Sequence, residues 1–462
     1  MKRLKGGFDI RISGRPSGSL QVLSESSTLC IPLRTRRFHF SEIAVQDNTE
    51  VLQGAILASD PKQYNVPLLA PRSGTVHVDR SLGQIVIDPV KLQASATDSP
   101  KDSDWPHAPS NLDSAGQLRF KLMKMGAWQF FTDAATGALP DPMVSPSALL
   151  VSTMNIEPFS ARGDVQLKEK LSNFTRGLEH LQPLLEYQPM FLVFPKINTE
   201  LARKIKDTIR GFAWIKLIEI PVKYPFDDFR LLARRLGLTS KTNKECVWAL
   251  RTEGVLAVDS VLTSSRAVTD RVVAVGGPGA KNPSHFKVPV GYPISELLKH
   301  AECQDLSRYL NGGVFSGTTF TEQQKGLDCE CNGITVLPDI VDRSFVKFLM
   351  PGFNRRSYSR AFASALRPVF IEKVDTGLCG EGRACVSCGF CAQVCPAEIV
   401  PSAIHKLVYQ SNIDEMEFYR PDLCIDCGLC SYVCPSKIGL NSEIASVKAK
   451  LQEELPSEKA GH

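Results

Sequence analysis

The sequence has no long apolar run and no stretch that resembles a secretion signal. Even the apolar residues 190–194 end at Pro195, well short of the roughly 18 to 20 residues that a membrane-spanning helix needs. The basic residues near the start are not followed by an apolar core of the kind found in signal peptides. We therefore expect a cytoplasmic protein that reaches a membrane only through a partner or a surface contact.

Charge of one sign and groups arranged for catalysis are also scarce. The net charge is +5 over 462 residues, and because the basic residues are dispersed, nucleic-acid binding has no support. The eight histidines are scattered, and no Ser-His-Asp set, histidine pair or pair of acids has a local arrangement suited to catalysis. Stand-alone catalysis by the side chains of this chain is therefore not indicated.

The composition, with 43% hydrophobic and 22% charged residues, is that of a globular protein. A chain of this length usually divides into about three domains, and its patterns predict a multidomain α/β and α+β protein. Strand candidates at 148–152, 190–194 and 214–220 alternate with helix-like segments at 166–182 and 198–211, which favours a mainly parallel sheet covered by helices. The expected units are a small β domain (1–92), an exposed linker (93–117), this α/β domain (118–265), a second small β-containing domain (266–335) and a cysteine-bearing section (355–462) that ends in a helix at 441–455.

Cysteine, in contrast, is abundant, with fourteen residues. A disulfide framework is not expected in a chain without a secretion signal, because the cytosol keeps thiols reduced. Eight of the cysteines form two copies of the pattern C-x2-C-x2-C-x3-C-P, which matches the run of bacterial ferredoxins. The copies are Cys385, Cys388, Cys391 and Cys395 before Pro396, and Cys424, Cys427, Cys430 and Cys434 before Pro435.

This spacing predicts two 4Fe-4S clusters with crossed ligation. Three thiolates on a tight loop hold three iron corners of a cubane, and the fourth cysteine, on the following helix, binds the other cluster. A structural zinc site, the alternative, would leave the third and fourth cysteines of each run without a use. The 28 residues between the two runs favour a helical two-cluster domain. The predicted ligand sets are Cys385, Cys388, Cys391 and Cys434 for one cluster, and Cys424, Cys427, Cys430 and Cys395 for the other.

Three further motifs carry weaker signals. Residues 276–279 follow a strand candidate but fit neither the dinucleotide fingerprint nor the P-loop, so a structural turn is favoured over a phosphate site. Residues 51–59 and 69–76 are similar to modules that carry biotin or lipoate, but no lysine stands in the expected hairpin, which leaves a scaffold role. Cys329 and Cys331 lack a second cysteine pair, so a structural role is favoured over metal binding or redox chemistry.

Several short segments together carry a family resemblance. They are residues 5–9, 70–76, 155–159, 270–283, 311–317, 350–352 and 432–435. With them, the chain resembles two related families: NqrA, the A-type subunit of the Na+-translocating NADH:quinone oxidoreductase, and the C-type subunit of the Rnf electron-transport complex. The middle of the chain is more similar to NqrA, which has counterparts of residues 122–128 and Trp248, whereas the doubled cysteine run is similar to the Rnf subunit. The chain therefore looks like a hybrid, an NqrA-like body with an intact two-cluster domain.

The resemblance implies a fold for each unit. In chain order the units are expected to be a barrel-sandwich-like β domain, a Rossmann-like α/β domain, a small β-grasp-like domain and an α-helical ferredoxin domain. The Rnf subunit carries a loop of the type G-x-G-G-A-G-F-P that helps to bind NADH and flavin. Residues 122–128 of this chain lack those glycines, and their bulky side chains would block approach of the backbone to a phosphate. We therefore do not expect NADH or FMN to bind there.

The resemblance also implies a function. The chain would be the electron-transfer subunit of an ion-translocating NADH:quinone oxidoreductase, peripheral on the inner face of the cell membrane. Its partners would be the membrane subunits of a redox-driven ion pump, together with electron donor and acceptor subunits. Quinone binding, proposed for the NqrA family, would be a second role to which no residue is assigned. The alternatives are an NADH-oxidising flavoprotein like the Rnf subunit, and a soluble iron-sulfur adaptor of another oxidoreductase.

Overall fold

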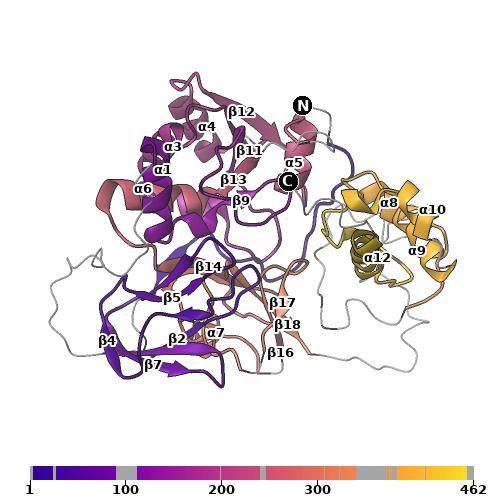
Figure 1. Ribbon diagram of the computed structural model, residues 1–462. Helices are drawn as coiled ribbons and strands as arrows, with labels where there is room; N and C mark the ends of the chain where they lie inside the picture. Colours follow the sequence, from indigo (N-terminus) through magenta and orange to yellow (C-terminus); the bar gives the residue numbers. More distant parts are fainter. Residues whose placement is uncertain are drawn as a thin grey trace.

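The computed structural model contains two β-rich units, an α/β unit and a helical C-terminal unit, which lies beside the others (Figure 1). Among the residues that it describes, every helix is too short or too polar to cross a bilayer. The described residues are 4–23, 26, 28–89, 112–197, 199–239, 246–305, 307–321, 323–339, 371, 374, 376, 382–410 and 413–454.

The first β unit consists of two small antiparallel sheets that share one core. The alternating apolar segments expected near residues 74 and 84 form adjacent strands, and Val76 faces Ile87 across them with both side chains fully buried. One sheet has the order β2 (Leu29–Pro32), β8 (Gln84–Pro89), β7 (Gly74–Asp79), β4 (Thr49–Val51), and the other β3 (Glu42–Ile43), β5 (Ile56–Asp60), β6 (Val66–Leu69).

Residues 4–23 do not join this β unit, although the sequence placed its start at residue 1. Strand β1 (Leu20–Val22) instead pairs in parallel with β15 (Ser284–Pro289), whose edge would otherwise be unpaired. Earlier in the segment, Phe8 bridges to Tyr224 of the α/β unit, and the Gly7 amide donates to the Val394 carbonyl at 2.9 Å. The segment therefore connects three units of the structure.

The α/β unit has a five-stranded sheet in the order β12-β11-β10-β13-β9. The first four strands are parallel, which confirms the expected mainly parallel sheet, and their chain order within the sheet is 3-2-1-4, as in doubly wound folds. The strands are β10 (Ala148–Ser152), β11 (Met190–Pro195), β12 (Ile215–Ile220), β13 (Val247–Arg251) and, antiparallel at one edge, β9 (Thr132–Asp133).

Helices cover both faces of this sheet. Because successive side chains of a strand point to opposite faces, Leu149 and Val151 pack with residues of α1, α3, α4 and α6, whereas Leu150 packs with residues of α5. The helices are α1 (Ser114–Lys124), α2 (Gly163–Leu167), α3 (Leu171–Leu184), α4 (Glu200–Ile209), α5 (Phe229–Leu236) and α6 (Thr252–Ser264).

Helices α3 and α6 approach closely at Gly177, where an added Cβ would lie 2.5 Å from the Val255 carbonyl oxygen. We expect Gly177→Ala to destabilise the protein by about 1–3 kcal/mol through overpacking, although alanine is the better helix former. Gly211→Ala is the matched control, because no atom lies within 4 Å of the added Cβ, and it should be neutral or stabilising by about 0.4–1 kcal/mol. Denaturant unfolding of both variants measures the difference, and equal stabilities would contradict the close approach.

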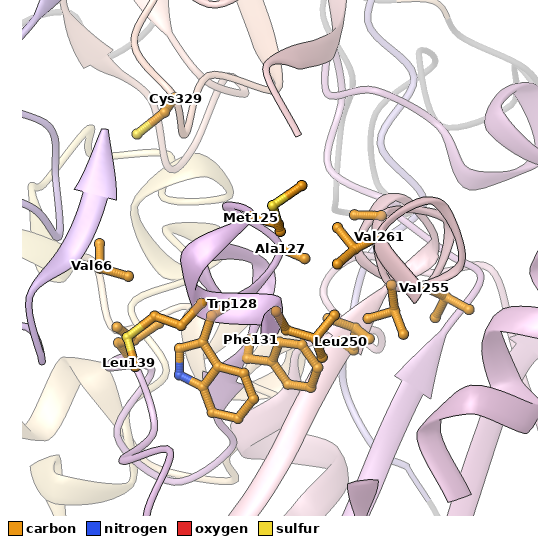
Figure 2. Packing of buried hydrophobic residues seen from close by; sticks show 14 of the residues in the cluster. Val66, Met125, Ala127, Trp128, Phe131, Leu139, Leu250, Val255, Val261 and Cys329 are labelled. Carbon is orange, nitrogen blue, oxygen red and sulfur yellow. The ribbon is translucent and has the colours of Figure 1, made fainter. Parts of the chain in front are cut away.

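The segment 122–128 belongs to the core and not to a loop after a strand. It runs from the last turn of α1 into a 3-10 turn, Trp128–Phe130. The fully buried Trp128 stacks on Phe131 with ring centroids 4.5 Å apart (Figure 2). It also packs edge-on with Trp248, with ring centroids 5.0 Å apart. Its Nε1–H donates to the Pro140 carbonyl at 3.1 Å. The bulky side chains of this segment therefore fill the core.

The second β unit holds a six-stranded sheet in the order β1-β15-β14-β18-β16-β17. The glycine-rich residues 276–279 form the turn between β14 and β15, and Gly277, with φ +121°, packs so closely that a Cβ would lie 2.3 Å from the Val336 oxygen. The remaining elements are β14 (Asp270–Gly276), β16 (Ser307–Asn311), β17 (Thr318–Thr319), β18 (Gly333–Pro338) and helix α7 (Ile294–His300).

The C-terminal unit is helical, as the spacing of the cysteine runs indicated. Two helices occupy the connection between the runs, and the last helix buries Ile444 and Val447 against them. The side chain of His405 on one of the connecting helices meets Glu443 on the last helix at 2.7 Å. The helices are α8 (Phe390–Val394), α9 (Pro401–Gln410), α10 (Ile413–Phe418), α11 (Leu429–Tyr432) and α12 (Leu440–Glu454).

Candidate functional site

The eight cysteines of the two runs surround two small cavities in the C-terminal unit. Each cavity is lined by three cysteines of one run and the last cysteine of the other. We call the first the outer site, with Cys385, Cys388, Cys391 and Cys434, and the second the inner site, with Cys395, Cys424, Cys427 and Cys430. These are the two sets that the sequence motif predicts; their role as cluster ligands stays a prediction.

The two runs fold in the same way, which explains how they supply equivalent side chains. In each, a glycine with positive φ, Gly389 (+76°) or Gly428 (+73°), starts a short helix that carries the third cysteine. The backbone before it also folds back on the first cysteine, because the Ser387 amide lies 3.4 Å from the Cys385 sulfur and Asp426 repeats this contact in the second run. The helices α8 and α11 then bring the fourth cysteines to the opposite sites.

The residues of both cavities fit an iron-sulfur cluster. Besides four thiols, each cavity is lined mainly by apolar side chains, such as Ile438 and Leu440 at the outer site and Ile399 and Leu429 at the inner site. Soft thiolate donors in an apolar pocket are the ligands that such clusters take. Among the described residues, no group of three or more histidine, cysteine or acidic side chains is close enough to hold a single metal ion.

Burial keeps the inner thiols protonated in the metal-free chain. It raises the pKa of Cys424 to about 11 and the pKa of Cys430 to about 12, with neighbouring cysteines adding to the shift of Cys430. These thiols would have to lose their protons when iron binds, because the thiolate is the form that acts as a ligand. Loading of the inner site is therefore expected to release protons.

The two sites differ in exposure. At the outer site Cys388 is exposed and the neighbouring Val386 is 67% exposed. At the inner site Cys424 is 9% and Cys430 8% exposed, and Ile425 joins the core of the α/β unit. One site therefore faces the surface and the other faces the body of the protein.

Helix α5 is the element that holds the inner site against the body. Arg230 donates to the Ile425 carbonyl and, at 3.1 Å, to Asp426, while Arg234 donates to the Leu423 carbonyl at 2.6 Å. Arg235, next along the helix, donates to the Pro396 carbonyl at 3.0 Å. Figure 1 shows α5 on the side of the α/β unit that faces the C-terminal helices. Three arginines of one helix thus contact the backbone on both sides of the inner cysteines.

A large cavity of about 940 Å³ lies at the carboxyl ends of β10 and β11. Its walls come from the residues after these strands, the start of α4 and the N-terminal segment, and they include Phe8, Phe159 and Tyr224. Doubly wound sheets bind their ligands at this edge, and the volume is that of a small-molecule site. We call this space the sheet-edge cavity. Sequence reasoning missed it, because no glycine-rich loop marks it; only the order of the parallel strands points to it.

Tyr224 connects the sheet-edge cavity with the inner site. It lines the cavity, and its hydroxyl donates to the Cys427 carbonyl at 3.0 Å. Its ring stacks on Phe315 with centroids 4.9 Å apart, and Phe315 in turn meets Tyr432 of α11 at 5.3 Å. Beside it, the carboxylate of Glu157 accepts from the Phe315 amide at 2.9 Å. Burial raises the pKa of Glu157, although its hydrogen bonds act in the opposite direction.

Cys329 and Cys331 lie away from both sites. Both are buried, at 6% and 2% exposed, in two different hydrophobic cores, and burial raises the pKa of each thiol. Figure 2 shows Cys329 in its core. The residue between the two cysteines, Glu330, forms an ion pair with Arg37. Because the two thiols lie in different hydrophobic cores, they do not face one common site, and the geometry supports the structural role.

Comparisons with known proteins find relatives over nearly the whole chain. Residues 113–266 match the family model of the NqrA second alpha/beta domain, and residues 374–438 match that of a 4Fe-4S dicluster domain. The chain is 24% identical over 431 residues to the A subunit of the Na(+)-translocating NADH-quinone reductase of Histophilus somni (strain 129Pt), covering 90% of this chain and 91% of that one. It is 26% identical to the A subunit of the same reductase from Teredinibacter turnerae, covering 87% and 88%. The resemblance to NqrA, with a dicluster domain, is therefore confirmed.

Solved structures give a more distant likeness. The chain aligns with an NAD+-reducing [NiFe]-hydrogenase in the air-oxidized state at a TM-score of 0.42 and 13% identity. The alignment covers 74% of this chain and spans 62% of that chain's length.

Proposed function

We propose that this chain, with a body similar to the A subunit of the Na(+)-translocating NADH-quinone reductase and a 4Fe-4S dicluster domain, carries electrons through two 4Fe-4S clusters within a complex of that kind. The observation that carries the proposal is the gathering of eight cysteines into two sets of four, each around an apolar cavity. Each cysteine run contributes cysteines to both sites, so the two sites lie next to each other. Electron transfer between them would therefore need no large motion of the protein.

The protein would work as a peripheral subunit on the inner face of the membrane. The relatives are named as subunits of a reductase that translocates sodium ions, so this chain would depend on membrane subunits for translocation and on neighbouring subunits as electron donor and acceptor. The first β unit would be a scaffold of the barrel-sandwich type, and the α/β and second β units would be of the Rossmann and β-grasp types.

The sheet-edge cavity would serve a small redox ligand, with quinone as the candidate that the name of the relatives suggests. Its aromatic and apolar wall residues suit a flat, apolar headgroup. A second candidate function also starts from this cavity, since its place at the carboxyl edge of a doubly wound sheet favours a nucleotide or flavin ligand, as in an NADH-oxidising subunit. Reduction of the isolated chain by NADH alone would support the second function over the first.

Iron analysis with EPR spectroscopy tests the proposal. The full chain, purified without oxygen, is expected to hold about eight irons and to give two spin-coupled signals when it is reduced by dithionite. Bound zinc, or a folded chain without metal, would overturn the electron-relay function and leave a scaffold or ligand-binding subunit. The same sample, mixed with NADH before dithionite, separates the two candidate functions.

A further inference from the structure

The charged groups around the inner site are unevenly balanced. Arg230 and Lys448 both bind the carboxylate of Asp426, and Arg230 also lies 3.5 Å from Asp228. Arg234 is different, because its nearest hydrogen-bond partner is the neutral carbonyl of Leu423. Among the described residues no carboxylate lies within ion-pair distance of Arg234; Asp228 and Asp422 act on it only from further away. Arg230, Arg234 and Lys448 therefore share two close carboxylates, whereas Arg235 of the same helix has its own partner in Glu398.

Arg234 is also near the cysteines themselves. Leu423, which accepts its hydrogen bond at 2.6 Å, directly precedes Cys424, a cysteine that lines the inner cavity. It is half-buried at the contact between α5 and the C-terminal unit, so water screens its charge less than that of a surface arginine. At the outer site the neighbouring Arg383 is exposed.

We propose that Arg234 raises the reduction potential of the cluster at the inner site, so that an electron is favoured at the site that faces the sheet-edge cavity. The inference rests on the proposed function, because it needs clusters at both sites. Reduction adds one electron to a site without making or breaking a bond, and dithionite supplies that electron in the experiment. A fixed positive charge stabilises the more negative, reduced state, and charge near a cluster is one of the terms that set its potential.

As a consequence, the two sites would define a path for electrons between the protein surface and the sheet-edge cavity. The outer site, with Cys388 exposed at the surface, is the one that a partner protein would reach. The inner site lies behind it, and Tyr224 joins the backbone of that site to the wall of the sheet-edge cavity. Arg234 would thus act as a positioning charge that holds the electron next to the place where a small redox ligand fits.

The test is a redox titration of the full chain, followed by EPR, for Arg234→Gln. We expect the equilibrium constant for reducing the inner cluster to fall by roughly tenfold, about 59 mV for a one-electron couple, while the outer cluster keeps its potential. The signals are assigned with Cys427→Ala, which should remove the inner one, and Cys388→Ala, which should remove the outer one. Iron content of Arg234→Gln should stay at that of the unchanged chain.

Two further variants separate charge from structure. Arg234→Lys keeps the charge but changes the hydrogen-bond geometry, so it should keep most of the inner potential. Arg210→Gln removes an exposed arginine at the end of α4 and should shift neither potential. A purely structural role of Arg234 would lower stability or iron content in the glutamine and lysine variants alike, without a selective shift in potential.

The outcomes distinguish this inference from the proposed function. Two clusters with an unchanged inner potential in Arg234→Gln, or with equal shifts of both potentials, would overturn the role of Arg234 and leave the electron relay intact. A chain without iron would overturn both. A fall confined to the inner signal, restored by lysine, would establish the role.

Discussion

Replacing Cys395 by alanine is expected to remove the cluster held by the second cysteine run and to spare the one held by its own run. Cys395 lines the inner cavity, while Cys434, the last cysteine of the second run, lines the outer one. A cubane needs a thiolate at each iron corner, so loss of one ligand of four should release or degrade that cluster. Iron content should fall from about eight to about four per chain.

The measurement is iron analysis combined with EPR on four variants. Cys395→Ala and Cys430→Ala should lose the same signal, whereas Cys434→Ala and Cys385→Ala should both lose the other. Cys303→Ala, at a half-buried cysteine outside both sites, is the control and should keep all of the iron. Loss of one and the same signal in Cys395→Ala and Cys385→Ala would show that each run binds its own cluster.

Trp128→Ala is expected to be the most destabilising single change in the α/β unit, at about 3–5 kcal/mol. The side chain is fully buried, stacks on Phe131 and packs against the edge of Trp248, so its removal leaves a cavity that large, rigid neighbours cannot readily fill. The carbonyl of Pro140 would also lose the hydrogen bond that the indole donates.

Denaturant unfolding, followed by circular dichroism, measures this cost. Trp214→Ala provides the comparison, because Trp214 is only half-buried beside Phe212 and should lose much less stability. Iron content should stay the same in both variants, since the cysteines lie in another unit. A Trp128→Ala protein as stable as Trp214→Ala would mean that residues 122–128 do not form part of a tightly packed core.

The features that sequence alone predicted correctly are those with a local signal. The strands at 148–152 and 190–194 are short apolar runs bounded by breakers, and they appear as β10 and β11. The helix expected at 441–455 appears as α12 because its apolar residues repeat at three and four positions. The cysteine spacing likewise depends on loop geometry within a few residues. The two sets that it names line the two cavities, and their role as cluster ligands stays a prediction.

The features that the sequence did not reveal depend on contacts between distant residues. Nothing in the pattern of residues 20–22 shows that they pair with β15 instead of the nearer β unit. The arginines of α5 look like an ordinary solvated face, yet Arg230, Arg234 and Arg235 all bind backbone of the C-terminal unit. The sheet-edge cavity forms where three segments meet, and none of them carries a recognisable motif alone.

The N-terminal segment also has a consequence for how the chain folds during synthesis. Gly7 and strand β1 are made early, but their partners, Val394 and β15, follow hundreds of residues later. At roughly 5–20 residues per second, the ribosome needs roughly 20–80 s to supply the last of these partners. Each part of the segment stays unpaired until its own partner has been made, and such long-range contacts slow folding. The final steps of folding would be the pairing of the N-terminal segment with these partners and the docking of the cysteine-bearing unit on α5. These steps would set when the inner site becomes enclosed.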